Sequence, residues 1–293
     1  MALIVPICAF LIGYFAVEQL KPLRPMLAAS LARVFIPILI IYNMVFYQLG
    51  SLWLVGLSFV SSIIFFSVFY LWGKDKLLAL CLSYLNGAWL GLPFALAVFG
   101  KEATNTIVAL YIGGSLFGNI CAVMAVSQIK QSTGFIVKNV LQAPPVIALT
   151  IAGVLSFWDL TAYQHSQAID LVYQINKFLV TFAGMCVLGM WLSKVKIQLD
   201  DVYLSLRLIF MRMLIAVGIC LAAYFVLPIP QHALTYAVIF MFFCLPPAAN
   251  IVALETHYQG TGHSVKYIAS GTIASAFIIS IYGIIVHSLG VLN

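Results

Sequence analysis

Two short stretches rich in glycine, proline and asparagine interrupt long apolar segments of the chain, and both have the composition of an anion site. Their residues are Asn86, Gly87, Gly91 and Pro93 in the first stretch, and Pro246, Pro247 and Asn250 in the second. Proline removes a backbone donor and clashes with the preceding helical turn, and glycine loosens a helix. A helix broken in this way restarts with exposed N–H groups and the positive end of its dipole. We therefore expect two new helix N-termini, near Phe94 and Ala248, to bind an anion without a buried lysine.

Each break taken alone has a simpler interpretation, because single prolines commonly kink helices that cross a membrane. The two breaks, however, form a matched pair, and each carries an asparagine whose amide can donate to a carboxylate. Backbone groups freed by a break are tolerated at membrane depth only against protein or a water-filled cavity. The matched pair therefore favours a binding site over two unrelated kinks.

The composition indicates which kind of protein positions these breaks. Of the 293 residues, 64% are hydrophobic and 8% are charged, against about 25% charged residues in an ordinary soluble domain. The mean hydropathy is +1.11. These values exclude a soluble globular enzyme and a disordered chain. The apolar runs are long and continuous, as in 54–72 and 272–289, which predicts membrane-spanning helices rather than a barrel.

Ten spans account for the apolar segments. They are predicted at 3–19, 26–48, 52–72, 77–99, 105–128, 139–157, 168–192, 202–227, 233–256 and 265–289. Loops after odd-numbered spans hold nine basic residues, and loops after even-numbered spans hold only Lys101. The nine are Lys21, Arg24, Lys74, Lys76, Lys130, Lys138, Lys194, Lys196 and Lys266. By the positive-inside rule, both termini are extracytoplasmic. The formal net charge of +6 then follows from topology and calls for no nucleic acid.

An odd number of spans in each half has a consequence for symmetry. Two homologous halves of five spans, 1–130 and 131–293, are necessarily inverted relative to each other. The fourth span of each half is the broken one. Interrupted spans at matching places in two halves point to a transporter binding site.

Several polar residues inside or beside spans have two interpretations each. Lys177 either snorkels to the outer surface or supports the site. Glu255 is either an interfacial carboxylate or a carrier of a coupling proton. Arg212 is expected to make an interior salt bridge or to contact a lipid headgroup. His257 and His263 have no third ligand nearby, so no metal is expected, and no motif indicates a cofactor. Six cysteines lie in separate apolar runs and are expected to be buried free thiols: Cys8, Cys81, Cys121, Cys186, Cys220 and Cys244.

The fourth span resembles that of the auxin efflux carrier family, which includes plant PIN-type transporters and bacterial carriers labelled malonate permeases. In the first broken span, the resemblance lies in the motif N-x-x-x-x-G-x-P at Asn86, Gly91 and Pro93. In the second, it lies in residues 245–250, followed by residues 253–255 and Tyr258. Residues 107–110, and Pro37 followed by Tyr42, also resemble the family. It implies ten helices in two inverted repeats. Broken helices 4 and 9 would cross in a transport domain of helices 3–5 and 8–10, beside a scaffold of helices 1, 2, 6 and 7. Asn86, Gly91, Pro93 and Pro246 would be crossover residues, with Tyr42 near them.

The same resemblance implies elevator-like efflux of small organic anions by a homodimer embedded in membrane lipid. The central loop, 127–138, is short, which fits a carrier of a bacterial inner membrane. A sodium-coupled bile-acid-type symporter is the alternative, but few side chains near Pro93 and Pro247 offer hard oxygen ligands. An intramembrane enzyme would need paired acids or His/Glu clusters within spans. We therefore expect no enzymatic activity. A membrane sensor would carry a signalling domain, and a pump a P-loop; neither occurs in the sequence.

Overall fold

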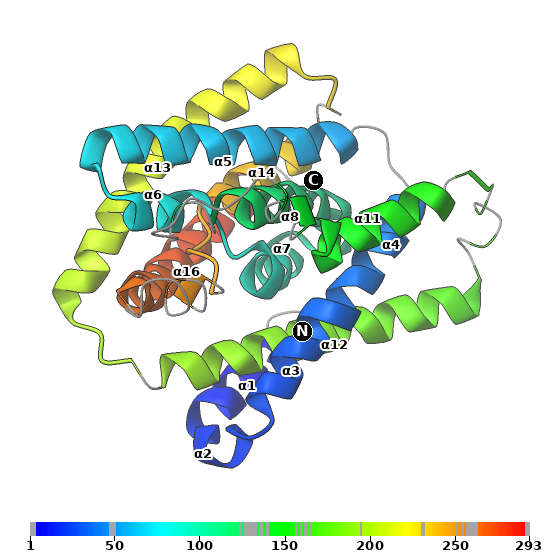
Figure 1. Ribbon diagram of the computed structural model, residues 1–293, viewed down its shortest axis with the longest axis horizontal. Coiled ribbons are helices and arrows are strands. Elements are labelled where there is room, and N and C mark those ends of the chain that lie inside the picture. Colours follow the sequence, from blue (N-terminus) through cyan, green and yellow to red (C-terminus); the bar gives the residue numbers. More distant parts are fainter. Residues whose placement is uncertain are drawn as a thin grey trace.

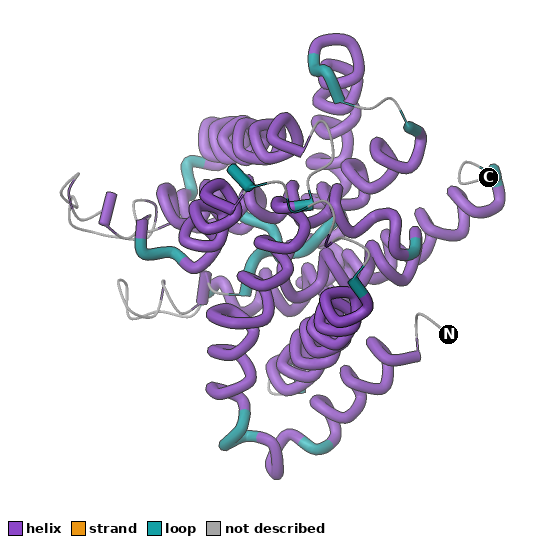
Figure 2. Tube along the Cα trace, turned by 90° about the vertical axis from the view of Figure 1, so that its right-hand side faces the viewer, coloured by secondary structure: helices purple, strands orange, loops and turns teal. Residues whose placement is uncertain are grey.

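The computed structural model describes most of the chain. The described residues are 4–46, 51–122, 125, 134, 137–138, 141–155, 157–158, 160, 163, 166–193, 195–229, 232–249, 251–252, 255 and 263–290. Within these ranges the chain is helical and contains no β-strand (Figure 2). Asn250, His257 and Tyr258 lie outside the described residues.

The helices follow the predicted segments closely. The first half contains α1 (Ile4–Phe15), α2 (Val17–Leu20), α3 (Arg24–Ser30), the π-helical turn η1 (Leu31–Phe35), α4 (Ile36–Val45), α5 (Ser51–Gly73), α6 (Lys76–Ser83), the π-helical turn η2 (Gly87–Gly91), α7 (Leu92–Phe99), the 3₁₀ turn η3 (Lys101–Ala103), α8 (Thr104–Phe117) and the π-helical turn η4 (Gly118–Ala122). The second half contains α11 (Pro144–Leu155), α12 (Gln167–Leu192), α13 (Leu199–Val226), α14 (Ala233–Phe243) and α16 (Ser264–Ser288). Each of the ten predicted segments therefore contains at least one helix.

Five helical segments are long and apolar enough to cross a membrane. They are Leu52–Gly73, Lys101–Ala122, Gln167–Met190, Leu199–Val226 and Ser264–Ser288. Four further apolar helices are shorter, among them Trp89–Phe99 and Ala233–Phe243. These two are short because each belongs to a predicted span that is broken. The architecture is consistent with a helical integral membrane protein.

Close packing joins helices that are distant in sequence. α1 lies along α12, α4 packs on α11, and α5 packs on both α6 and α8 (Figure 1). Glycine makes the α1–α12 contact possible. A Cβ at Gly13 would lie 2.0 Å from the carbonyl oxygen of Cys186, and one at Gly189 would lie 2.2 Å from that of Phe10. Small residues of this kind allow helix backbones in membranes to approach closely, so α1 and α12 form one tightly packed pair.

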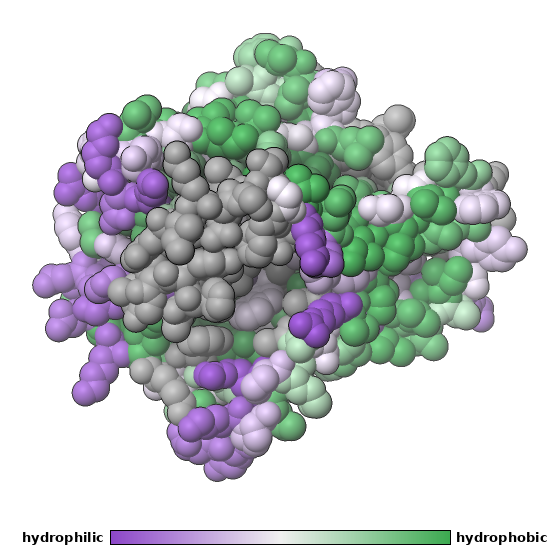
Figure 3. All heavy atoms as spheres, viewed as in Figure 1, coloured by the Kyte–Doolittle hydropathy of each residue, from purple (hydrophilic) through white to green (hydrophobic). Residues whose placement is uncertain are grey.

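The outer surface is apolar over long stretches of helix. On α13, the exposed side chains include Phe210, Leu214 and Phe225. Figure 3 shows hydrophobic residues over the right-hand part of one face and hydrophilic residues at its left and lower edges. Cys8 is exposed, so the expectation that all six cysteines are buried is wrong. It shares the outward face of α1 with Phe15, two turns further along the helix.

Candidate functional site

The two breaks lie against each other and pair through their backbones. The N–H of Asn86 donates to the carbonyl of Pro246 at 2.9 Å, and the N–H of Ala248 donates to the carbonyl of Tyr84 at 2.8 Å. Leu85 and Pro247 face each other in an isolated antiparallel bridge. Each unwound segment therefore satisfies backbone groups of the other, which solves the problem of irregular backbone at membrane depth. We call these paired segments, 84–87 and 245–248, the crossover.

The first helix restarts earlier than the sequence suggested. α6 ends at Ser83, and Asn86 caps the π-helical turn η2, with its Oδ1 accepting the Trp89 N–H at 3.2 Å. Pro93 then lies in the first turn of α7, where a proline without an N–H donor costs little. The restart near Phe94 was therefore wrong, because the asparagine cap rather than the proline sets the start of the new helical segment.

Two glycines of the first break let the second one approach. A Cβ at Gly87 would lie 3.1 Å from Cε2 of Phe242, and one at Gly91 would lie 2.8 Å from Cδ1 of Leu245. Larger side chains at these positions would push α14 away from η2. Gly87 and Gly91 thus serve the crossover through their small size.

The amide nitrogen of Asn86, Nδ2, has no hydrogen-bond partner in the described part of the chain. Asn86 is 4% exposed, so this donor is buried. An unsatisfied buried donor costs about 1–3 kcal/mol, and each such group calls for an explanation. A bound acceptor, such as a carboxylate oxygen, would provide it.

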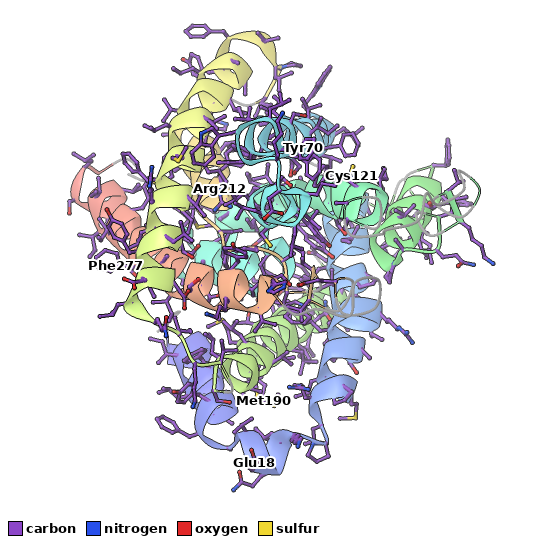
Figure 4. The ribbon with its side chains drawn as sticks, turned by 60° about the vertical axis from the view of Figure 1, so that its left-hand side comes forward. Glu18, Tyr70, Cys121, Met190, Arg212 and Phe277 are labelled. Atoms are coloured by element: carbon purple, nitrogen blue, oxygen red, sulfur yellow. The ribbon has the colours of Figure 1, made fainter. Side chains whose placement is uncertain are left out.

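Arg212 of α13 holds the other side of the crossover. It is fully buried (Figure 4). Its Nε donates to the carbonyl of Phe243 at 2.7 Å, its Nη2 to that of Leu245 at 2.5 Å, and its Nη1 to that of Leu82 at 3.3 Å. These carbonyls belong to the C-terminal ends of α6 and α14, where the helix dipole is negative.

The predicted salt bridge or headgroup contact of Arg212 is therefore wrong. The planar guanidinium presents several donors in fixed directions, which suits it to several carbonyls at once. A buried cation on α13 thus lies against the crossover, and its partners are backbone carbonyls rather than a carboxylate. The sequence shows that a basic residue lies deep in an apolar helix, but it does not show which backbone carbonyls that residue will contact.

A cleft of about 270 Å³ lies between α12 and α7, the helix that follows the first break. Its lining residues are Val5, Pro93, Leu96, Gly100, Lys101, Gln174, Lys177, Phe178 and Thr181. We call it the Lys177 cleft. α12 forms one wall, and α7 with the loop that follows it forms the other. Pro93, in the first turn of α7, therefore connects the crossover region to the cleft.

Lys177 is mostly buried within this cleft rather than extended to the surface. It is 8% exposed, with Nζ 3.5 Å from Oγ1 of Thr104 and 5.4 Å from the ring centroid of Tyr173. The Tyr173 ring stacks on that of Tyr42, with centroids 3.9 Å apart. Lys177 and Tyr42 are thus joined through Tyr173, a residue that nothing in the sequence singled out.

A second and smaller cavity, of about 30 Å³, lies further along α12. Its lining residues are Trp89, Leu188, Leu192, Val195, Ala249, Val252, Val265, Ile268, Ala269 and Thr272. We call it the Trp89 cavity. Between it and the Lys177 cleft, Gly184 faces Trp89 so closely that a Cβ at position 184 would lie 3.1 Å from the Trp89 carbonyl oxygen.

Glu255 has a structural position apart from the Lys177 cleft. It is fully buried and accepts the backbone N–H of His263 at 2.7 Å, the backbone N–H of Ser264 at 2.9 Å, and the Ser264 hydroxyl. A carboxylate in this position caps the N-terminus of α16 and is favoured by its dipole. The capping bonds account for the burial of Glu255; proton coupling stays a prediction.

The structure therefore brings together most of the predicted site residues. Asn86, Gly87, Gly91, Pro246 and Pro247 lie at or against the crossover, whereas Asn250 lies outside the described residues. In the described part of the chain, no group of three His, Cys, Asp or Glu side chains could hold a metal ion. No family model matches this sequence, and no curated protein matches it.

Proposed function

We propose that this protein is a secondary carrier that exports small organic anions such as carboxylates across a bacterial inner membrane. The observation that carries the proposal is the amide nitrogen of Asn86, which has no partner in the described part of the chain and is buried where two broken helices pair. Broken helices at membrane depth are typical of transporter sites, where irregular backbone lines the substrate pathway. Two buried cations, Arg212 against the crossover and Lys177 in the cleft, also favour an anion.

The pairing of the two breaks also supports the inverted-repeat plan. The repeats would comprise 1–130 and 131–293, and the two fourth helices would meet at the crossover. The scaffold would contain α1, α4, α11 and α12, and the transport domain the remaining long helices. In this plan the Lys177 cleft lies on the boundary between the two domains. Movement of α7 along α12 would then carry an anion from one side of the membrane to the other, in the manner of the auxin efflux carriers that the sequence resembles.

Flux into proteoliposomes tests the proposal. Purified protein is reconstituted and exposed to a panel of labelled mono- and dicarboxylates, with the proton and sodium gradients varied separately. We expect saturable uptake of at least one carboxylate and none of its methyl ester. Uptake that requires sodium would favour the bile-acid-type alternative, and absence of uptake across the panel in either orientation would contradict the proposal.

Two substitutions at Asn86 separate its cap from its amide donor. Asn86→Asp keeps an oxygen that can accept the Trp89 N–H but replaces the donor by a second acceptor, whereas Asn86→Ala removes both. Hydrogen bonds to charged groups contribute about 1.5–3 kcal/mol, so either change should weaken anion binding by about tenfold or more. Both changes should lower the melting temperature, Asn86→Ala because the cap is lost and Asn86→Asp because a carboxylate is buried, so affinities are compared at a temperature at which both variants are folded. Unchanged affinity in Asn86→Asp would show that the amide does not contact the substrate.

A further inference from the structure

Lys177 is a buried lysine that forms no ion pair with the residues that the structure describes, and the negative charge of Asp170, two turns earlier on α12, acts on it only from beyond ion-pair distance. Among the described residues, no carboxylate oxygen lies within 4.0 Å of its Nζ. Its ammonium group makes a long hydrogen bond to Thr104 and lies over the ring of Tyr173. A buried charge is costly unless it is paired, and an ionisable residue at membrane depth points to function.

The contact with Tyr173 does not replace an ion pair. A cation over an aromatic ring is attracted only by the quadrupole of the ring, and this contact uses one side of the ammonium group. The Tyr173 ring also stacks on the ring of Tyr42. Lysine has three donors, and one of them reaches Thr104 at 3.5 Å. The remaining capacity faces the Lys177 cleft, which Lys177 lines.

The walls of the cleft offer an anion both polar and apolar contacts. Gln174 and Thr181 flank Lys177 on the same face of α12, one turn before it and one turn after it. The opposite wall contributes Lys101, whose like charge raises the electrostatic potential in the cleft. Val5, Leu96 and Phe178 supply the apolar lining. A volume of about 270 Å³ holds about nine water molecules at about 30 Å³ each, which is room for a small organic acid.

We propose that the Lys177 cleft is a binding site for the carboxylate of an organic anion with a compact apolar body, separate from the crossover. Lys177 pairs with the carboxylate, Lys101 attracts it at the mouth of the cleft, and the apolar part lies on Leu96 and Phe178. This inference rests on the proposed function, because it places the first contact with the substrate on the scaffold helix α12.

Such a site would also connect two parts of the molecule. Lys177 belongs to α12, whereas Lys101 and Leu96 belong to the segment that continues the first broken helix. An anion between the two lysines reduces their mutual repulsion and draws the two walls together. Occupancy of the cleft is therefore expected to favour the arrangement in which α7 lies against this part of α12.

Titration of the detergent-solubilised full-length protein with benzoate tests the site, with benzamide as a neutral analogue of the same shape. We expect benzoate to bind at least about tenfold more tightly than benzamide, a difference of about 1.4 kcal/mol. Lys177→Met, which keeps the length of the side chain, should abolish that preference. Lys101→Met should reduce it a few fold, and Lys196→Met, at an exposed lysine distant from the cleft, should leave it unchanged.

A second variant covers the case in which Lys177→Met does not fold. Thr181→Leu keeps the charge but fills the cleft, and it should weaken benzoate binding by about tenfold. Equal binding of benzoate and benzamide to the wild-type protein, or undiminished preference in both folded variants, would overturn the inference. Proteoliposome flux is measured in parallel. Carboxylate flux without a Lys177-dependent preference for benzoate would refute the binding site in the cleft but not the proposed carrier function. Lys177-dependent binding of benzoate without flux of any carboxylate would refute the carrier function but not the binding site.

Discussion

Two hollows lie along the same helix, α12, and they differ in size and in charge. The Lys177 cleft has a volume of about 270 Å³ and is lined by two lysines. The Trp89 cavity has a volume of about 30 Å³, and none of its lining residues is charged. Both are bordered by residues of the first break, Pro93 in the cleft and Trp89 in the cavity.

This difference is what one state of an alternating-access carrier would have. In the proposed transport cycle, the boundary between the two domains would be open and polar at the Lys177 cleft, and closed and apolar at the Trp89 cavity. Gly184 against Trp89 separates the two hollows. If the positive-inside prediction is correct, the open side faces away from the cytoplasm, because Lys101 follows an even-numbered span. The two hollows would exchange roles when α7 moves along α12.

Loss of the Arg212 side chain should have the largest effect on this arrangement. Arg212→Leu removes hydrogen bonds to three buried carbonyls, each worth about 1.5–3 kcal/mol. We expect it to abolish recovery of monodisperse protein, or to lower the melting temperature severely. Arg207→Leu is the matched control, since Arg207 is an exposed arginine of the same helix. A normal melting curve for Arg212→Leu would show that the crossover holds without its cation.

Thiol labelling compares the two hollows directly. In a background that lacks reactive native cysteines, Gln174→Cys in the Lys177 cleft and Ala269→Cys in the Trp89 cavity are treated with a water-soluble maleimide. Gln174 is half-buried and Ala269 is buried. Labelling at position 269 requires the packed Trp89 cavity to open first. An opening free energy of about 1.4 kcal/mol or more lowers the population of the open form about tenfold, so labelling at position 174 should be at least about ten times faster. Equal rates would contradict the proposed asymmetry.

The close contact between Gly184 and Trp89, which lies between the two hollows, can be disrupted by a larger side chain. Gly184→Leu places a side chain where a Cβ would already lie 3.1 Å from the Trp89 carbonyl oxygen. Overpacking of this kind costs about 1–3 kcal/mol, so transport should fall by about tenfold while the protein stays folded. The control is Gly218→Leu on α13, where nothing lies within 4 Å of the added Cβ. If Gly184→Leu transports at the wild-type rate, α12 does not pass closely over Trp89 during the transport cycle.

The sequence was sufficient to predict the helices and the positions of both breaks. Apolar length and the spacing of glycine and proline are local properties, so the segments 77–99 and 233–256 were identified with their interruptions. The point at which the first helix restarts was not predicted, because Asn86 competes with Pro93 to set it and the cap prevails. The role of Arg212 was not predicted either. Its three partners lie 31, 33 and 130 residues away and are backbone carbonyls, which do not depend on the type of side chain.

The Lys177 cleft shows the same limit in another form. Gln174 and Thr181 could have been placed beside Lys177 from helical periodicity alone. Their opposite wall could not, since Pro93 and Lys101 come from a distant segment and approach α12 only in the folded protein. Thus the sequence predicts which residues share one helix face, while the meeting of two faces depends on tertiary packing.

The smallest expected effect concerns the aromatic support of Lys177. Tyr42→Leu removes the ring that stacks on Tyr173, a contact worth about 0.5–1.5 kcal/mol beyond burial. If Tyr173 then shifts, Lys177 loses its fixed position, and benzoate affinity should fall by about two- to tenfold without loss of fold. Tyr70→Leu is a matched control. Tyr70 also stacks on a second ring, that of Phe66, and also lies beneath a lysine, Lys74 at 5.9 Å, but it is far from the cleft in sequence and absent from its lining. A similar loss in both variants would indicate general destabilisation. A loss confined to Tyr42→Leu would show that the stack of Tyr42 and Tyr173 maintains the charge on which the difference between the two hollows depends.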